Sequence, residues 1–193
     1  MQGTVALSFL QALYLLAPLL VAAALSAVVL RFDLAHALAR PIDAGRRFHG
    51  ERWLGDGKTY RGVVTAVVGA VIGVALQRSL GSRPGDIALL DYRAIDPLVL
   101  GLALGLGATL GELPNSFVKR RAHVAAGKTA TGPLRVVFWI WDQVDLLVLT
   151  WPLLLFWLRP SAMVVLASVL LVLVIHPLVA LIGWLVGARK SPR

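Results

Sequence analysis

The chain has 193 residues, of which 58% are hydrophobic and 15% are charged, and its formal net charge is +9. A soluble domain is closer to half apolar and a quarter charged, so this composition excludes a soluble single-core protein and a disordered chain. The sequence contains no cysteine, which excludes disulfides and thiolate metal sites.

Long uncharged runs predict an all-α integral membrane protein, a single domain built as a bundle of five transmembrane helices. Val5–Leu30 carries no charge over 26 residues, and Pro160–Ala188 carries none over 29, whereas a bilayer-spanning helix needs about 20. The first run is too long for a signal-peptide core and no Lys or Arg precedes it, so we expect a retained helix. The predicted spans cover residues 5–30, 62–77, 97–113, 136–158 and 161–188.

The distribution of basic residues predicts the orientation of the bundle. Segment 31–61 holds seven Lys and Arg, loop 114–135 holds five and tail 189–193 holds three, which is 15 on one side against four on the other. By the positive-inside rule, loops 31–61 and 114–135 are cytoplasmic. We therefore expect a multi-pass protein of the cell membrane, with its N-terminus outside and its C-terminus in the cytoplasm.

Three carboxylates lie unusually deep for a membrane protein. Only 13 uncharged residues, 146–158, follow Asp145 in the fourth span, which is about 20 Å of helix against a hydrocarbon core of roughly 30 Å. Asp142 and Asp145 are three residues apart and share one helix face. Glu112 likewise follows an uncharged run, the third, that is too short to cross the hydrocarbon core. These acids either pair with nearby arginines or reach headgroup water, or they bind a divalent cation such as Mg²⁺, which prefers oxygen ligands.

Basic residues flank these acids at the predicted ends of the second and third spans. They serve either as topology determinants in contact with lipid headgroups or as a clamp for phosphates beside the cation. In so apolar a chain, the positive charge indicates lipid headgroups and phosphates rather than nucleic acid. The residues concerned are Lys58, Arg61, Lys119, Arg120 and Arg121.

Smaller features predict how the helices pack against one another. Glycines spaced four apart, at 69/73, 101/105, 107/111 and 183/187, let helices approach closely in lipid. His176, which precedes Pro177, favours a hydrogen bond between helices over metal ligation, because no other histidine stands at a metal-binding spacing.

Three segments, in order along the chain, resemble one family. Residues 41–45 read PIDAG and residues 54–62 read LGDGKTYRG; Gly-Glu at 111–112 precedes SFVKRR at 116–121, and DQVD follows at 142–145. Together they resemble the CDP-archaeol synthases (CarS), integral-membrane lipid cytidylyltransferases that use CTP. Glu112 stands where the family usually has Asp, and the connection from Arg121 to Asp142 is longer than in archaeal members, which indicates a divergent member.

The resemblance implies that CTP and a lipid phosphate of the 2,3-di-O-geranylgeranylglyceryl type give a CDP-lipid and pyrophosphate, in phospholipid biosynthesis. It implies Mg²⁺ on Glu112, Asp142 and Asp145, with the five basic residues holding the phosphates. It also implies nucleotide binding by Asp56, Gly57, Lys58, Thr59 and Ser116, although Asp56 equally suits the shaping of a glycine-rich turn. The lipid phosphate is already an ionised nucleophile, so positioning and charge neutralisation suffice for catalysis.

Other functions remain open at the level of sequence. Within the same enzyme class, the lipid is alternatively phosphatidic acid, giving CDP-diacylglycerol. In another class, the three acids form a carboxylate relay in a small transporter. A transport pathway needs polar groups throughout the bilayer, whereas these acids gather toward one side. The expected partners are CTP, the lipid phosphate and membrane lipids, without nucleic acid.

Overall fold

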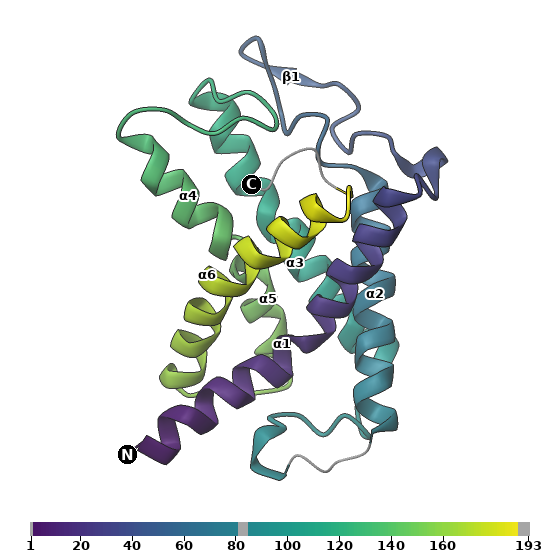
Figure 1. Cartoon of the computed structure of the whole chain (residues 1–193), viewed down its shortest axis with the longest axis vertical. Coiled ribbons are helices and arrows are strands. Elements are labelled where there is room, and N and C mark those ends of the chain that lie inside the picture. Colours follow the sequence, from purple (N-terminus) through teal and green to yellow (C-terminus); the bar gives the residue numbers. More distant parts are fainter. Residues whose placement is uncertain (1, 81–84, 189–193) are drawn as a thin grey trace.

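The computed structural model describes residues 2–80 and 85–188, and within them the predicted helical bundle is confirmed (Figure 1). Five stretches are long and apolar enough to cross a membrane, with α4 and α5 together forming the fourth. The helices are α1 (Gln2–Arg31), α2 (Tyr60–Ser79), α3 (Pro97–Arg121), α4 (Leu134–Val144), α5 (Leu147–Leu154) and α6 (Ala162–Leu185). The short 3₁₀ turns η1 (His36–Leu38) and η2 (Gly85–Ile87) and the strands β1 (Arg47–Phe48) and β2 (Glu51–Arg52) lie between them.

Polar residues set the first turns of three helices. Thr59, Asp96 and Ser161 each accept a hydrogen bond from a backbone N–H two or three residues later, which caps α2, α3 and α6. Pro97 follows Asp96 at the first helical position, where its missing N–H has no helical partner to lose. These caps explain why the helices begin close to the predicted boundaries.

Two helices differ from the predicted spans. The sequence predicts a loop from residue 114, but α3 continues through Pro114 to Arg121. Its last turn therefore carries three basic residues, which complement the negative end of the helix dipole. The fourth span is broken into α4 and α5 at residues 145–146. Segment 31–61, predicted as a loop, contains the β1–β2 hairpin, whose turn uses His49 and Gly50 in left-handed conformations.

Glycines bring the helices into backbone contact, as the small-residue spacing predicts. An added Cβ atom at Gly69 would lie 2.4 Å from the Cα of Ala22 in α1, and one at Gly101 would lie 2.5 Å from the Cα of Val71 in α2. Both distances are too short for any side chain. α2 is therefore held between α1 and α3 at separations that larger residues would not allow.

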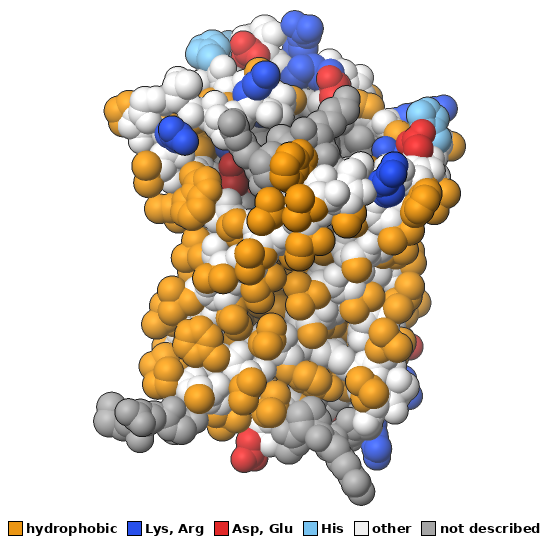
Figure 2. Space-filling view, in the orientation of Figure 1, with side chains coloured by type: hydrophobic (Ala, Val, Ile, Leu, Met, Phe, Trp, Pro, Cys, Tyr) orange, Lys and Arg blue, Asp and Glu red, His pale blue; other side chains and the backbone are white. Residues whose placement is uncertain are grey.

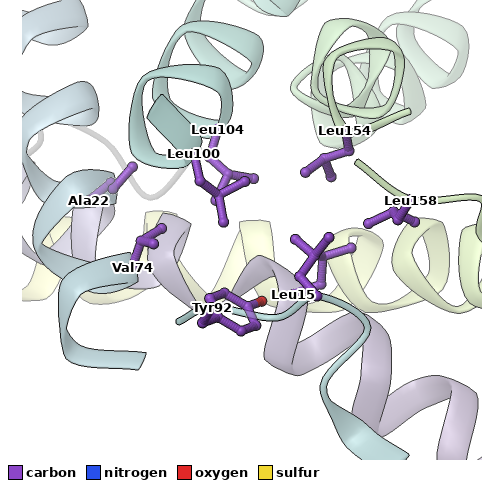
Figure 3. Close-up of a cluster of buried hydrophobic side chains, with 10 residues drawn as sticks. Leu15, Ala22, Val74, Tyr92, Leu100, Leu104, Leu154 and Leu158 are labelled. Atoms are coloured by element: carbon purple, nitrogen blue, oxygen red, sulfur yellow. The ribbon is translucent and has the colours of Figure 1, made fainter. Parts of the chain in front are cut away.

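The main apolar core lies toward the end of the bundle that carries the connection between α2 and α3 (Figure 3). Leu15 of α1, Val74 of α2, Leu100 of α3 and Leu154 of α5 are each at most 1% exposed there. Tyr92 reaches the same cluster from the connection and is 6% exposed. Because this end is closed by packed side chains, the opposite end is where a site can open.

Charged side chains gather at that opposite end. The hairpin and the connection between α3 and α4 lie there, whereas α1 begins at the other end (Figure 1). Figure 2 shows apolar side chains covering the middle of the molecule, with Lys, Arg, Asp, Glu and His concentrated above them. The chain is thus a multi-pass membrane protein. The described residues do not include 81–84 and 189–193. Arg83 and the basic tail 189–193, which were counted for the orientation, therefore lie outside them.

Candidate active site

The two deep aspartates lie together and share one amide. Asn115 of α3 is 2% exposed, and its Nδ2 donates hydrogen bonds to Asp142 Oδ1 at 2.8 Å and to Asp145 Oδ2 at 2.7 Å. Asp142 belongs to α4, and Asp145 occupies the break that follows it. The predicted acid pair therefore forms at the junction of α3 with the broken helix, because one amide NH₂ group bridges both carboxylates.

The break in the fourth span places Asp145. The backbone N–H of Val148 bonds to the Asp145 carbonyl at 3.1 Å, a short-range bond that tightens the chain between α4 and α5. Gly111 of α3 packs directly on this carbonyl, because an added Cβ atom there would lie 2.5 Å from it. Asp145 is 5% exposed. Irregular backbone at membrane depth persists only where protein buries it, as α3 does here.

Two lysines neutralise acids at the site. The ammonium group of Lys119 pairs with Asp142, and that of Lys58, from the segment before α2, pairs with Glu112 of α3. Lysines thus pair with Glu112 and Asp142, whereas one of the two alternatives drawn from the sequence expects arginines. Asn115 joins Asp142 to Asp145, and Glu112 follows Gly111, which packs on the Asp145 carbonyl, so the two ion pairs and Asp145 form one charged cluster.

Oxygen atoms in this cluster fit a divalent cation. Within residues 2–80 and 85–188, Asp145 Oδ1 and Asn115 Oδ1 are buried and accept no hydrogen bond. Carboxylate and amide oxygens are the donors that Mg²⁺ takes. The predicted set of Glu112, Asp142 and Asp145 is not gathered as three ligands in the described chain. The structure instead places Asn115 beside the two aspartates, with Glu112 engaged by Lys58.

The remaining basic residues of the predicted phosphate clamp have different surroundings. Arg61 donates to Asp33 Oδ1 at 2.6 Å, which holds the end of α1 against the start of α2. Arg120 is 7% exposed, and its Nε is buried without a hydrogen-bond partner in the described chain. An unpartnered buried guanidinium nitrogen is available to an anion, so Arg120 keeps its predicted role as a proposal.

Arg121 holds the hairpin against α3. Its Nη2 donates to the carbonyl of Arg52 at 2.7 Å, and its guanidinium carbon lies 4.8 Å from the ring centre of Phe117 and 5.4 Å from that of Phe48. Arginine stacked on aromatic rings is well suited to fix one element on another. Arg121 therefore positions the hairpin. Its Nε and Nη1 are buried without a hydrogen-bond partner in the described residues, so its expected clamp role also stays a proposal.

The predicted nucleotide-binding residues divide in the same way. Gly57, Lys58 and Thr59 line a cavity, and Thr59 also caps α2 by accepting a hydrogen bond from Gly62 N at 3.2 Å. Asp56 is exposed and pairs with Arg52 at 2.8 Å, which favours its role in shaping the turn. Ser116 makes no side-chain hydrogen bond within the residues that the structure describes.

The cavity is apolar along most of its length and charged at one end. It encloses about 310 Å³ between α1, α2, α3 and α6 and ends at Lys58 and Glu112. Leu20 and Leu30 on its wall are 38% and 43% exposed, so part of this wall reaches the molecular surface. Its walls include Leu13, Leu16, Leu19, Ala23, Ala27, Val63, Ala66, Ala108, Leu171, Ile175 and Val179.

His176 also lines this cavity and bonds to another helix, as the sequence predicts. Its Nδ1 lies 3.3 Å from the backbone carbonyl of Gln143 in α4. A carbonyl only accepts hydrogen bonds, so Nδ1 carries the proton. The contact ties α6 to the helix that bears Asp142.

A family model described as CarS-like, CDP-archaeol synthase, matches residues 5–192 of the chain. The chain belongs to this family. Curated relatives agree: the CDP-archaeol synthase of Methanosarcina barkeri is 32% identical over 166 residues, covering 79% of this chain and 90% of the relative. That of Methanopyrus kandleri is 35% identical over 158 residues, covering 79% of each chain. The family resemblance of the three sequence segments is thus confirmed.

A solved structure shares the fold of this CarS-like chain. It was published as a structural insight into an intramembrane enzyme for archaeal membrane lipids biosynthesis. It is 24% identical, covers 86% of this chain and 89% of its own, and superposes with a TM-score of 0.61. The bundle described above is therefore the fold of an intramembrane protein already observed.

Sequence reasoning missed two polar residues of this region. Asn115 was overlooked because an amide inside an apolar helix carries no charge to flag it. Asp43, which is 4% exposed, lies in the PIDAG motif, but nothing in a loop sequence indicates that its carboxylate is buried. A buried polar group needs hydrogen-bond partners, and those partners are visible only in three dimensions.

Proposed function

We propose that this chain transfers the cytidylyl group of CTP to a lipid phosphate of the archaeol type, giving a CDP-lipid and pyrophosphate. The observation that carries the proposal is the mainly apolar cavity whose lining includes the Lys58–Glu112 ion pair, beside the acid cluster. A lipid tail in such a cavity brings its phosphate to the charged end. The family membership supports the same reaction.

In this reaction, a phosphate oxygen of the lipid attacks the α-phosphorus of CTP. The new phosphorus–oxygen bond forms as the bond to the β-phosphate breaks, and pyrophosphate leaves with the electron pair. No protein nucleophile takes part. The chain contributes by holding the two phosphates in line and by neutralising their charge, which are the main terms in phosphoryl-type transfer.

Lys58 and Lys119 are the residues placed to neutralise phosphate charge. Each ammonium group pairs with a carboxylate, which fixes its position beside the cavity or the acid pair. A phosphate that arrives there meets a preorganised donor, which needs little rearrangement in the transition state. Arg120 offers a further unpartnered donor nearby on α3.

The oxygens of Asp142, Asp145 and Asn115 are those that would hold a divalent cation, Mg²⁺ in our proposal. A bound cation supplies charge neutralisation on the triphosphate, which lysines alone provide incompletely. Glu112 joins this set only if Lys58 turns to a phosphate. The proposed orientation places the site in the cytoplasm, where CTP is available, with the N-terminus outside.

The proposal is tested with purified protein, radiolabelled CTP, Mg²⁺ and one lipid phosphate at a time. We expect label in the lipid fraction with the geranylgeranyl ether phosphate, stoichiometric pyrophosphate, and no product when ATP replaces CTP. Equal or faster turnover of diacyl phosphatidic acid would assign the alternative lipid. Ion flux through vesicles without any lipid-dependent pyrophosphate would overturn the enzyme in favour of the transporter, which the CDP-archaeol synthase relatives do not favour.

A further inference from the structure

The carboxylate of Asp43 is fully buried in the cytoplasmic segment before α2 and is surrounded only by donors. Its side chain is 0% exposed. Oδ1 accepts from Arg52 Nη2 at 2.6 Å and from the Gly45 N–H at 3.1 Å. Oδ2 accepts from Arg52 Nε at 3.2 Å and from the N–H groups of Leu54 and Gly55 at 3.0 Å each.

These bonds fix the start of the turn that leads to Lys58. The N–H groups of Leu54 and Gly55 donate hydrogen bonds to the carboxylate. Gly55 also adopts a φ of +98°, which residues with a side chain rarely adopt. An added Cβ atom at Gly55 would also lie 3.0 Å from the Cβ of Ala126, in the connection between α3 and α4. The turn is therefore held both by Asp43 and by its fit against that connection.

The far end of the turn is held by the residues around Asp43. The N–H of Ile42 donates to the Lys58 carbonyl at 2.8 Å, and that of Tyr60 donates to the Arg40 carbonyl at 3.1 Å. Pro41 and Thr59 form an isolated antiparallel bridge between the same two stretches. One short segment thus binds the beginning of the turn through a side chain and its end through the backbone.

We propose that Asp43 is a positioning residue for the reaction: it fixes the turn 54–58 and so holds Lys58 over Glu112 at the charged end of the cavity. The Asp43 side chain bonds only to Gly45, Arg52, Leu54 and Gly55 among the described residues, and so acts through the backbone that carries Lys58. This inference rests on the role given to Lys58 under the proposed function. Arg52 is the counterion that keeps the buried carboxylate charged.

Replacing Asp43 with asparagine separates its positioning role from any general effect of surface charge. Asp43→Asn retains the shape but turns one acceptor oxygen into an NH₂ group that faces donors, so at least two of the five bonds are lost. Glu51→Gln makes the same chemical change on the adjacent hairpin, at a side chain that is 43% exposed. Both proteins are first checked for an unchanged size-exclusion profile in detergent.

A double-mutant cycle with Lys58→Met is the decisive kinetic test. We expect Asp43→Asn to lower kcat/KM by about 10- to 100-fold in the unmodified background and by less than twofold in Lys58→Met. Asp43→Glu should stay within about threefold of the unmodified activity, and Glu51→Gln within about twofold. Equal losses from Asp43→Asn in both backgrounds, or no loss in either, would overturn the proposal.

Hydrogen exchange supplies a readout that does not need turnover. Asp43→Asn should speed exchange of the amides in residues 45–58 and leave those of α3 unchanged. If the unmodified chain fails to consume CTP, the proposed function fails and the exchange result still decides whether Asp43 holds the turn. Unchanged exchange in residues 45–58 would contradict the inference, whatever the activity.

Discussion

Gly111 of α3 lies against the carbonyl oxygen of Asp145, so close that an added Cβ atom would stand 2.5 Å from it. The same Cβ atom would be 3.3 Å from the amide nitrogen of Leu149 in α5. Backbone therefore packs on backbone where the fourth span is broken. The position of the Asp145 carboxylate depends on this contact, because the break has no room to shift toward α3.

Substitution of Gly111 by alanine should consequently weaken both the fold and the reaction. Overpacking of this kind costs about 1–3 kcal/mol, and the displaced Asp145 should lower turnover as well. The measurement is the melting temperature in detergent together with kcat/KM. Gly62→Ala is the matched control for stability, because its Cβ atom would meet only Thr59 Oγ1, at an ordinary 3.6 Å. A Gly111→Ala protein as stable as Gly62→Ala would contradict the contact.

The acid pair should show its proposed cation without any turnover. We expect Mg²⁺ to raise the melting temperature of the unmodified protein, since a ligand that binds only the folded state stabilises it. Asp145→Asn should abolish that rise and lower kcat/KM by about 100-fold or more. Chelation should stop turnover and Mg²⁺ should restore it. An Asp145→Asn protein that still responds to Mg²⁺ would remove this residue from the cation site.

Asp142 should behave differently from Asp145, because Lys119 pairs with it. Asp142→Asn leaves that ammonium group without its carboxylate at a place where little water reaches it, so the free energy of unfolding should fall along with activity. Asp145→Asn instead removes a buried carboxylate that forms no ion pair within the described residues. Comparison of the two melting curves in the absence of Mg²⁺ tests the difference; a similar loss in both would argue against the Lys119 pair.

The orientation of the bundle is testable because the chain has no cysteine of its own. Ala94 lies in the connection between α2 and α3, and Ala125 in the connection between α3 and α4; both are exposed. In intact cells, an impermeant maleimide should label Ala94→Cys and should reach Ala125→Cys only after permeabilisation. The reverse pattern would place the N-terminus in the cytoplasm.

The hydrogen bonds around Asp43 predict that the segment before α2 loses stability in acid. Arg52 first, and then the backbone amides of Gly55, Leu54 and Gly45, hold the pKa of Asp43 well below its ordinary value of 3.8. The stabilisation is complete above that value and is lost as the pH falls below it toward the folded-state pKa. Hydrogen exchange of residues 45–58 should thus be protected equally at pH 5 and 7. Below pH 4 the unmodified protein should lose protection in these residues as Asp43 becomes protonated. The Asp43→Asn protein should not show this loss.

Much of the molecule follows from the sequence alone. The uncharged runs predict the helical bundle, since only helices satisfy their own backbone in lipid over such lengths. The motifs around Lys58, Lys119 and Asp142 indicate the family, which the comparisons confirm. The short fourth run also predicts that Asp142 and Asp145 lie deep, because a helix has a fixed rise per residue.

Only the tertiary structure decides which of these charged groups meet. Lys119 and Arg121 are two residues apart on α3, yet one contacts Asp142 and the other stacks on the hairpin ring of Phe48. Sequence spacing gives the direction in which each side chain leaves its own helix, but not the residue that it contacts. The bridge from Asn115 to both aspartates, the burial of Asp43 and the cavity between α1 and α6 arise from packing between distant segments. Such contacts depend on where glycines let the helices touch, and that geometry appears only when the bundle is assembled.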